Sequence, residues 1–198
     1  MTREEIEEKY SALASDYDKK ILPQAGYTAH KILPEQLLRV CSPKRVVDIG
    51  CGTGISSELL LAQGISVVGV DAATGMLEEA TKRSFTDLVL HDISEPLPFS
   101  DSCFDAALIL GVTEFIEDLT SVLREVSRIL VDKGVVAITI ALPNKQSSLK
   151  HYTHSSQEVR GLFSQAGFIV RWSKKFFGYT KLSANEDVEY EGFILEKR

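Results

Sequence analysis

Residues 46–54 read VVDIGCGTG, an apolar run that closes on an acid and leads into three glycines at alternate positions. The apolar run predicts a buried strand over Arg45 to Ile49. Glycine permits the tight turn that must follow and lets the backbone approach a ligand closely. A helix expected over Ile55 to Gln63 would add free N–H groups and the positive end of its dipole. The stretch therefore predicts a strand, a ligand-binding turn and a helix.

The rest of the chain repeats this alternation of apolar run, turn and helical stretch, which implies parallel strands joined by crossover helices. We expect further strands at residues 65–70, 88–90, 104–110, 135–141, 168–177 and 188–197. Helices are expected over 75–82, capped by Thr74, over 119–130, ended by Gly134, and from Ser155 or Ser156 to Gly167. In such an open α/β sheet, ligands bind at the carboxyl ends of the strands.

The composition is that of an ordinary soluble globular protein, with 44% hydrophobic and 25% charged residues. The net charge of −6 disfavours a nucleic-acid partner, because such proteins usually carry a basic excess. Cys41, Cys51 and Cys103 form no C-x-x-C pair, so we expect no metal site. No apolar stretch could span a bilayer, and residues 1–9 lack the apolar segment of a secretory signal. These features predict a cytoplasmic protein without a membrane partner.

Two classes of ligand compete for the glycine turn. A dinucleotide fingerprint would need a third small residue after Gly50 and Gly52, and that position is Ile55. An acid at Asp71, after the second expected strand, could accept hydrogen bonds from ribose hydroxyls in either class. The frame that is present, G-x-G-x-G with an acid two positions before it, disfavours the nicotinamide-dependent oxidoreductases.

Taken together, four stretches resemble the class I S-adenosylmethionine-dependent methyltransferases. VVDIGCGTG is similar to motif I of this family, DAATGML at 71–77 to the segment after its second strand, and FDAALIL at 104–110 to its fourth strand. Residues 119–142 are similar to the helix and fifth strand. The resemblance covers residues 44–142, and more weakly the remainder. It implies an α/β fold with a doubly wound, Rossmann-like, seven-stranded and mostly parallel sheet whose last strand is antiparallel, and S-adenosyl-L-methionine as cofactor.

The N-terminal segment YSALASDYD, residues 10–18, resembles the Y-D-x-x-A-x-x-Y-D segment of small-molecule members such as the ubiquinone and menaquinone C-methyltransferases. It is also similar to the Williams–Beuren-region methyltransferase-like proteins, and it departs from the pattern at Ser11. The resemblance implies that Tyr10 and Tyr17 approach the methionine part of the cofactor, where a ring face beside a sulfonium gives a cation–π contact. Their spacing of seven also fits an ordinary core face of one helix.

The resemblance implies a set of cofactor-binding residues. Asp71 would accept hydrogen bonds from the ribose hydroxyls, and Asp92 would accept one from the adenine amino group. The N–H of Ile93 would donate a hydrogen bond to a ring nitrogen. Asp48 has two interpretations, contact with the methionine amino group or a purely structural role, and Cys51 fits a small turn residue better than a nucleophile, since no basic residue adjoins it. The full set is Tyr10, Tyr17, Asp48, Gly50, Cys51, Gly52, Gly54, Asp71, Ala72, Met76, Asp92, Ile93 and Leu110.

We expect one methyltransferase domain over residues 1–198. Residues 1–42 would form an N-terminal helical cap in which Pro34 kinks or splits the second helix, because it removes a backbone bond to His30. Residues 43–142 would form the cofactor-binding core, and 143–198 a lid loop, a helix and the last two strands. The cap and the polar loop 143–154 are both expected to fold over the site.

No catalytic residue is needed beyond those that position the acceptor, because a sulfonium is already an activated methyl donor. Alignment alone can supply roughly 7–11 kcal/mol, and a general base helps only if the acceptor must lose a proton. His91, beside Asp92, and Glu114, just beyond the fourth strand, are the candidates, although Glu114 also fits a surface acid at a helix start. His151 and His154 lack a third metal ligand.

The expected function is methyl transfer to a small-molecule acceptor by in-line displacement. An apolar or aromatic acceptor is favoured, since five tyrosines could line a capped pocket, and no N-P-P-Y signature for adenine or planar amides stands at residues 110–112. A non-catalytic S-adenosylmethionine-binding module and a protein-directed methyltransferase remain alternatives. The acceptor, the atom methylated and the oligomeric state stay open. The five tyrosines are Tyr10, Tyr17, Tyr27, Tyr152 and Tyr179.

Overall fold

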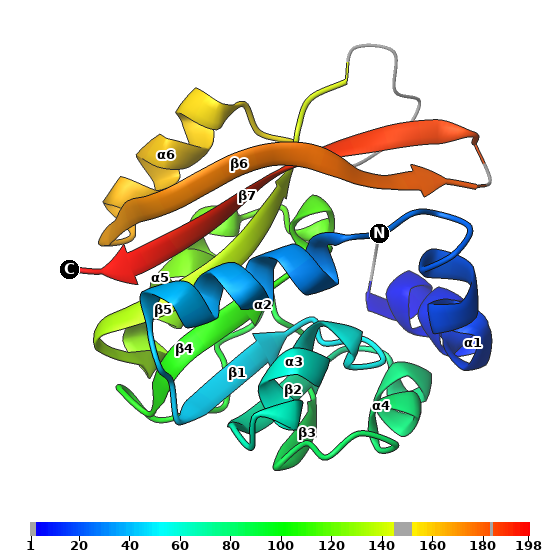
Figure 1. The fold of residues 1–198 in the computed structure, drawn as a ribbon, viewed down its shortest axis with the longest axis horizontal. Helices are drawn as coiled ribbons and strands as arrows, with labels where there is room; N and C mark the ends of the chain where they lie inside the picture. The colour runs from blue at the N-terminus through cyan, green and yellow to red at the C-terminus, as the bar shows by residue number, and fades with distance from the viewer. Residues whose placement is uncertain (1–2, 145–151, 183) are drawn as a thin grey trace.

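A seven-stranded sheet runs through the molecule in the order β3-β2-β1-β4-β5-β7-β6 (Figure 1). The structure is a computed structural model that describes residues 3–144, 152–182 and 184–198. Strand β7 is antiparallel to both of its neighbours, and the other pairs are parallel. The strands are β1 (Arg45–Ile49), β2 (Ser66–Asp71), β3 (Asp87–Leu90), β4 (Phe104–Ile109), β5 (Leu130–Ala141), β6 (Phe168–Lys181) and β7 (Glu186–Lys197).

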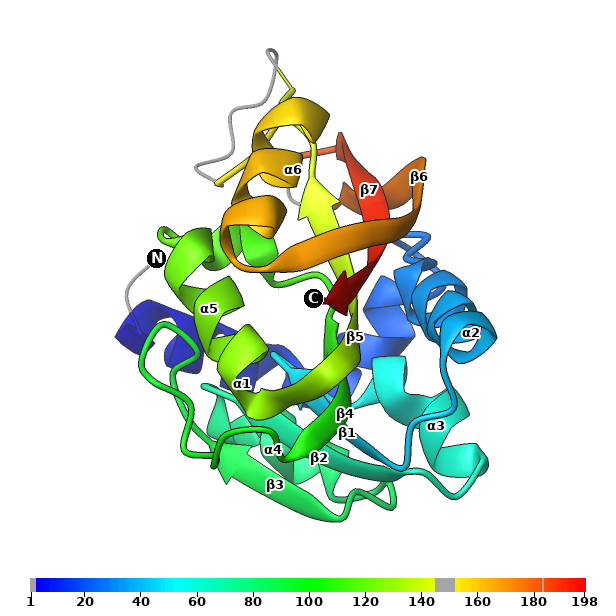
Figure 2. The ribbon, with the colours of Figure 1, turned by 90° about the vertical axis from the view of Figure 1, so that its left-hand side faces the viewer.

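Helices cover both faces of this sheet (Figure 2). On one face α5 (Leu119–Ile129) and α6 (Ser156–Gln165) pack on strand residues such as Val47, and on the other α2 (Ala29–Val40) and α3 (Glu58–Ala62) pack on residues such as Val46. Neighbouring strand residues serve opposite faces because side chains alternate along a strand. Each fully buried aliphatic side chain of these two layers contributes about 1.5–3 kcal/mol. The predicted α/β fold with an antiparallel last strand is confirmed.

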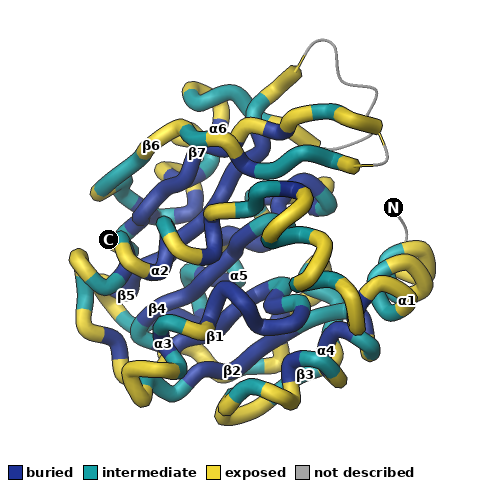
Figure 3. The backbone as a smooth tube through the Cα atoms, turned by 45° about the vertical axis from the view of Figure 1, so that its right-hand side comes forward, coloured by how far each residue is buried: buried dark blue, intermediate teal, exposed yellow. Residues whose placement is uncertain are grey.

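The remaining helices lie at the carboxyl ends of the strands or beside them. They are α1 (Arg3–Ile21), α4 (Thr74–Ala80) and two short 3-10 segments, η1 (Ile55–Ser57) and η2 (Thr113–Phe115). Helix α1 packs mainly on α4, at the edge of the molecule, and Figure 3 shows it largely exposed or half-buried. Ala14 is its buried residue. The helix therefore lies beside the carboxyl ends of the strands and is not part of the core of the sheet.

The chain reverses direction across the sheet at β1. Strands β2 and β3 lie on one side of β1, and β4, the next strand along the chain, lies on its other side. Ligands of open α/β sheets bind at such a switch point, outside the carboxyl ends of the strands. The topology thus places the ligand site next to the turn that follows Ile49.

Several sequence-based boundaries are corrected by the structure. The helix expected over residues 55–63 is a 3-10 turn, η1, followed by the short α3. Helix α2 continues through Pro34, so the predicted split is absent. Gly134 does not end a helix: β5 already begins at Leu130, and Lys133 takes a φ of 60° in an irregularity that lets the strand continue. Of the two serines considered, Ser155 is the cap of α6 and forms a capping box with Glu158.

The cap predicted at Thr74 is also wrong. Helix α4 begins at Thr74 itself, and the residue before it, Ala73, has no side chain that could cap the helix. In the described parts of the chain, no helix has the length and the apolar character needed to cross a bilayer.

Candidate functional site

A cavity of about 600 Å³ opens at the carboxyl ends of β1, β2 and β4. This volume is in the usual range for small-molecule sites. Its floor is formed by the turn after β1, the end of β2, the loop after β3 and the residues that follow β4. Its walls come from α1, from the last residues of β6 and from Tyr190 of β7. Segments from both ends of the chain therefore enclose one site at the switch point of the sheet.

The glycine turn exposes its backbone to this cavity. Gly50 and Gly52 have φ values of 71° and 54°, a region that favours glycine. A Cβ on Gly50 would lie 2.7 Å from a methyl group of Val112, so no side chain fits at this position without a shift of Val112. A Cβ on Gly52 would meet only the sulfur of Met76, at 4.0 Å, and would otherwise occupy the cavity. The turn therefore leaves space for a ligand at Gly52.

The carboxylate of Asp71 braces this turn. Its Oδ2 accepts a hydrogen bond of 2.7 Å from the N–H of Gly52, and its Oδ1 accepts one of 2.9 Å from the N–H of Ala73. Burial raises the pKa of Asp71, and the hydrogen bonds from the backbone oppose that rise. Since a carboxylate has about four acceptor positions, Asp71 can hold the turn and still accept from two ribose hydroxyls. The residues present thus fit an adenosine cofactor.

The loop after β3 brings the second acid to the cavity. Asp92 and Ile93 both line it, as predicted. One carboxylate oxygen of Asp92, Oδ1, accepts hydrogen bonds from the N–H and the hydroxyl of Ser94, at 2.9 and 2.7 Å. The other oxygen accepts no hydrogen bond from the residues that the structure describes. Met76 packs with Ala73 against Ala14, Tyr10 and Tyr17 of α1. These side chains could hold an adenine edge and the rest of a nucleoside between α4 and α1.

Eleven of the predicted cofactor residues line the cavity, and Asp48 and Gly54 do not. Asp48 is 1% exposed, accepts a hydrogen bond of 2.7 Å from the hydroxyl of Ser57, and has its pKa raised to about 7 by burial. A Cβ on Gly54 would lie 2.4 Å from the ring of Phe85. The geometry favours the structural interpretation of Asp48 and a packing role for Gly54.

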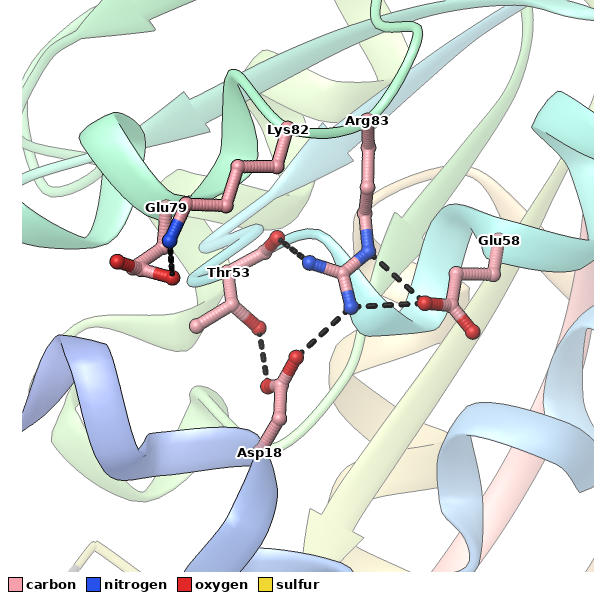
Figure 4. A network of polar contacts seen from close by, with 6 residues as sticks. All are labelled: Asp18, Thr53, Glu58, Glu79, Lys82 and Arg83. Carbon is pink, nitrogen blue, oxygen red and sulfur yellow. Dashed lines mark hydrogen bonds and ion pairs between the residues drawn. The ribbon is translucent and has the colours of Figure 1, made fainter.

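Helix α1 is fastened to the glycine turn by a polar network that sequence analysis missed (Figure 4). The hydroxyl of Thr53 donates to Asp18 at 2.6 Å, and the guanidinium of Arg83 donates to the other oxygen of Asp18 at 2.7 Å. Arg83 also donates to the carbonyl of Thr53 at 2.7 Å and to Glu58 at 2.7 and 3.0 Å. Three segments that are distant in sequence meet here. Asp18 was the last residue of a recognised motif, but nothing in the sequence singled out Arg83.

Helix α1 also supplies the capping groups that α4 lacks. The carboxylate of Glu7 accepts from the N–H of Thr74 at 2.8 Å, and the hydroxyl of Ser11 accepts from the N–H of Gly75 at 2.9 Å. A Cβ on Gly75 would lie 2.8 Å from the backbone of Ser11, so a glycine is required for this close approach. The free N–H groups at the start of α4 are thereby satisfied by the covering helix.

Five tyrosines and one buried acid also line the cavity. Tyr152 is not part of this lining, whereas Tyr190, which sequence analysis did not select, is. Glu114 is not a surface acid: it is 2% exposed, lines the cavity, and accepts a hydrogen bond of 2.7 Å from the hydroxyl of Tyr190. Burial raises its pKa. The lining tyrosines are Tyr10, Tyr17, Tyr27, Tyr179 and Tyr190.

The other reactive candidates lie away from the cavity or are inert. His91 does not line it, and its backbone N–H donates to the carbonyl of Asp71 at 2.9 Å. Burial raises the pKa of the Cys51 thiol, which does not favour a nucleophile. His151 lies outside the described residues, and His154 is not in the lining. Over residues 3–144, 152–182 and 184–198, no group of three or more His, Cys, Asp or Glu side chains is placed to hold a metal ion.

Comparison with known proteins agrees with this geometry. A family model described as a methyltransferase domain matches residues 47–138. The malonyl-[acyl-carrier protein] O-methyltransferase of Legionella pneumophila is 32% identical over 154 residues, which are 74% of this chain and 53% of that protein. The demethylmenaquinone methyltransferase of Thermotoga maritima is 31% identical over 138 residues, 68% of this chain and 60% of that protein. The chain thus spans little more than half the length of these curated relatives.

The fold is that of a methyltransferase. A crystal structure of an S-adenosylmethionine-dependent methyltransferase from Methanosarcina mazei matches with a TM-score of 0.70 and 17% identity, over 82% of this chain and 96% of that one. Residues 47–138 thus match a methyltransferase domain, and the chain has the fold of the S-adenosylmethionine-dependent methyltransferases, whose cofactor is S-adenosyl-L-methionine.

Proposed function

We propose that this chain transfers the methyl group of S-adenosylmethionine to a small-molecule acceptor by in-line displacement. The observation that carries the proposal is that one cavity contains both an adenosine-type half, at Gly52, Asp71 and Asp92, and a tyrosine-lined half that ends at Glu114. A donor and an acceptor bound in these halves would meet near the end of β4. Holding two reactants in line can supply roughly 7–11 kcal/mol of the barrier.

The residues of the chain have separate tasks in this proposal. Asp71 would accept from the ribose, Asp92 and the N–H of Ile93 would bind the adenine, and Met76 would pack on its ring. Tyr10 and Tyr17 would lie beside the methionine end together with Leu110. When bound, the cofactor supplies an electrophilic methyl group on a sulfonium. Support comes from the position of all these residues in one lining.

Helix α1 would exclude water from the transfer. Burial and the neighbouring negative groups raise the pKa of Tyr10 and Tyr17, so both remain neutral phenols at physiological pH. Their rings lie edge to face with centroids 6.1 Å apart, and Tyr10 meets Phe115 of η2 in the same way at 5.9 Å. An aromatic wall of this kind favours a cationic sulfonium without offering a competing nucleophile.

The names of the two curated relatives include both a carrier-protein-linked and a small-molecule acceptor, so they do not decide between these classes for this chain. The cavity volume of about 600 Å³ favours a small acceptor, and the net charge of −6 favours one that is not a nucleic acid. A cytoplasmic location and a single domain over residues 1–198 belong to the same proposal. The alternatives are a non-catalytic S-adenosylmethionine-binding module and a protein-directed methyltransferase.

Turnover distinguishes these possibilities. The purified chain is incubated with S-adenosylmethionine and a panel of amines, alcohols, phenols and thiols, and release of S-adenosylhomocysteine is measured. The proposal predicts release with at least one small acceptor. Release only with added protein or RNA would make a macromolecule the substrate. No release with any acceptor, although the cofactor binds, would favour the binding module.

A further inference from the structure

Glu114 is an unusual group to find at the acceptor end of the cavity. It lies in η2, directly after β4, and is 2% exposed. Its Oε1 accepts the hydrogen bond of 2.7 Å from Tyr190, and its Oε2 is buried and has no hydrogen-bond partner among residues 3–144, 152–182 and 184–198. The side chain therefore has one satisfied and one unsatisfied oxygen at the edge of a ligand cavity.

Burying a carboxylate without a positive partner is costly, so it is rarely retained for stability alone. The groups that shift the pKa of Glu114 are its own burial, the Tyr190 hydroxyl and the backbone, and none of them is cationic. Glutamine or an apolar residue would fill the same space at a lower cost. A ligand that brings both a positive charge and an N–H donor would remove this cost.

The surrounding tyrosines point to the same kind of ligand. Tyr10, Tyr17, Tyr27 and Tyr179 line the cavity with Tyr190, and the charge of Glu114 adds to burial in raising the pKa of each. Aromatic faces are negative and attract cations. The ring of Tyr10 already shows this behaviour, since the ammonium of Lys9 lies 4.9 Å from its centroid.

Four cationic side chains also line the cavity, and all of them come from α1 and the end of β6. Lys20 pairs with Asp16 at 3.1 Å, and the charge of Lys181 adds to burial in lowering the pKa of Lys9. None of the four shifts the pKa of Glu114. Within the described residues none of the four forms an ion pair with Glu114, so the buried acid has no cationic partner there. The four are Arg3, Lys9, Lys20 and Lys181.

We propose that Glu114 is the acceptor-binding carboxylate and that the acceptor is an aliphatic amine, which binds as its ammonium form among the tyrosines. This inference rests on the proposed function and deepens it. The missing partner of Oε2 is then an N–H of the acceptor, and Tyr190 holds the carboxylate in place through Oε1.

The chemical step balances with the groups present. The bound ammonium passes one proton to the Glu114 carboxylate and becomes a neutral amine. The nitrogen lone pair forms the new C–N bond while the S–CH₃ bond breaks, and its electron pair stays on sulfur to give neutral S-adenosylhomocysteine. The product leaves as a methylated ammonium, and Glu114 returns its proton to water.

Three probes with one skeleton test the inference: phenethylamine, 2-phenylethanol and 3-phenylpropanoate, each titrated by calorimetry into the chain saturated with S-adenosylhomocysteine near neutral pH. We expect the amine to bind roughly tenfold or more tightly than the other two, as a charge-assisted hydrogen bond provides. Glu114→Gln should abolish this preference and leave the affinity for S-adenosylhomocysteine unchanged. Glu117→Gln is the matched control, because Glu117 is exposed and outside the lining, and it should keep the preference.

Three results would overturn the inference. They are equal binding of amine and alcohol to the wild-type chain, no binding of the amine, and an amine preference that survives in Glu114→Gln. A further contradicting result would be a Glu114→Gln variant that no longer binds S-adenosylmethionine but still binds S-adenosylhomocysteine. Glu114 would then contact the sulfonium and not the acceptor. If Glu114→Gln does not fold, the relative affinities of the three probes for the wild-type chain test the inference. Absence of any S-adenosylhomocysteine binding would instead refute the proposed function, and the inference with it.

Discussion

The hydroxyl of Thr53 in the glycine turn donates a 2.6 Å hydrogen bond to Asp18 of α1, 35 residues earlier in the chain. This bond ties the covering helix to the loop that would carry the cofactor. Arg83 strengthens the tie, since it donates to Asp18 and to the carbonyl of Thr53, each at 2.7 Å (Figure 4). The side chains of Arg83 and Asp18 are 17% and 31% exposed, so water weakens this ion pair less than it would at the surface. The contact therefore fixes the position of α1 relative to the glycine turn.

Loosening this contact should release α1 without unfolding the sheet. Asp18→Ala removes the acceptor of both Thr53 and Arg83, and we expect α1 to lose about 1–2 kcal/mol of docking free energy. Hydrogen exchange of the α1 amides should accelerate several-fold, and exchange in β1 and β4 should not change. Asp16→Ala is the control, because its ion pair with Lys20 is half exposed. Equal exchange of α1 in both variants would contradict the role of Asp18.

A side chain at Gly52 should block the cofactor half of the cavity. A Cβ there would enter the cavity, and the φ of 54° adds strain of about 1–2 kcal/mol. Gly52→Ala should therefore reduce affinity for S-adenosylhomocysteine by at least tenfold, measured by calorimetry. Gly64→Ala carries the same strain at a φ of 75°, with nothing within 4 Å of its Cβ. That control should lose stability and keep its affinity.

Asp71 should contribute to cofactor binding through its ribose contacts. Asp71→Ala should cost roughly 1–3 kcal/mol of binding free energy, because two charge-assisted hydrogen bonds are lost. Part of this loss reflects the N–H of Gly52, which donates to Asp71 at 2.7 Å. Asp87→Ala, at the exposed start of β3, is the matched control. Unchanged affinity in the Asp71 variant would show that the adenosine lies elsewhere.

The stability of the unliganded chain should fall with rising pH through Asp48. Burial raises the pKa of Asp48 from 3.8 to about 7, so the folded state binds the proton more tightly than the unfolded state. Between these values the folded chain carries more protons, and the free energy of unfolding decreases as pH rises. Asp48→Asn removes this titration. As pH rises from about 5 to about 8, the free energy of unfolding of the variant, measured with denaturant, should increase relative to wild type by on the order of 1–3 kcal/mol. If the difference in free energy of unfolding between Asp48→Asn and wild type did not change with pH, the raised pKa of Asp48 would be contradicted.

The parts of the site that depend on local sequence were predicted well. The strand Arg45–Ile49 and the glycine turn follow from a pattern within a few residues, and Asp71 and Asp92 were placed by the ends of the expected strands. The repeated pattern predicted parallel strands, whereas the antiparallel last strand was implied only by the family resemblance. Glu114 was a candidate acid or base that also fitted a surface position, and the surface interpretation was wrong. Its side chain is buried and accepts a hydrogen bond from Tyr190, 76 residues further along the chain. No local pattern reports such a contact.

The helix ends show the same limit. Thr74 has the residue type of a cap, but Glu7 already satisfies its N–H from α1, so the tertiary contact replaces the local one. Arg83 follows α4 without any motif, yet it joins three segments. Tyr190 lies in a strand that the pattern predicted, but its direction into the cavity depends on how β7 pairs with β5. Such residues can be located only once the fold is known.

Calorimetric titration with S-adenosylmethionine, S-adenosylhomocysteine and NADH tests the central claim most directly. The cavity at Gly52, Asp71 and Asp92 predicts that both sulfur compounds bind with dissociation constants on the order of micromolar, about −8 kcal/mol, and that NADH does not bind. Binding of NADH without the sulfur compounds would contradict the account, because the glycine turn would then serve a dinucleotide.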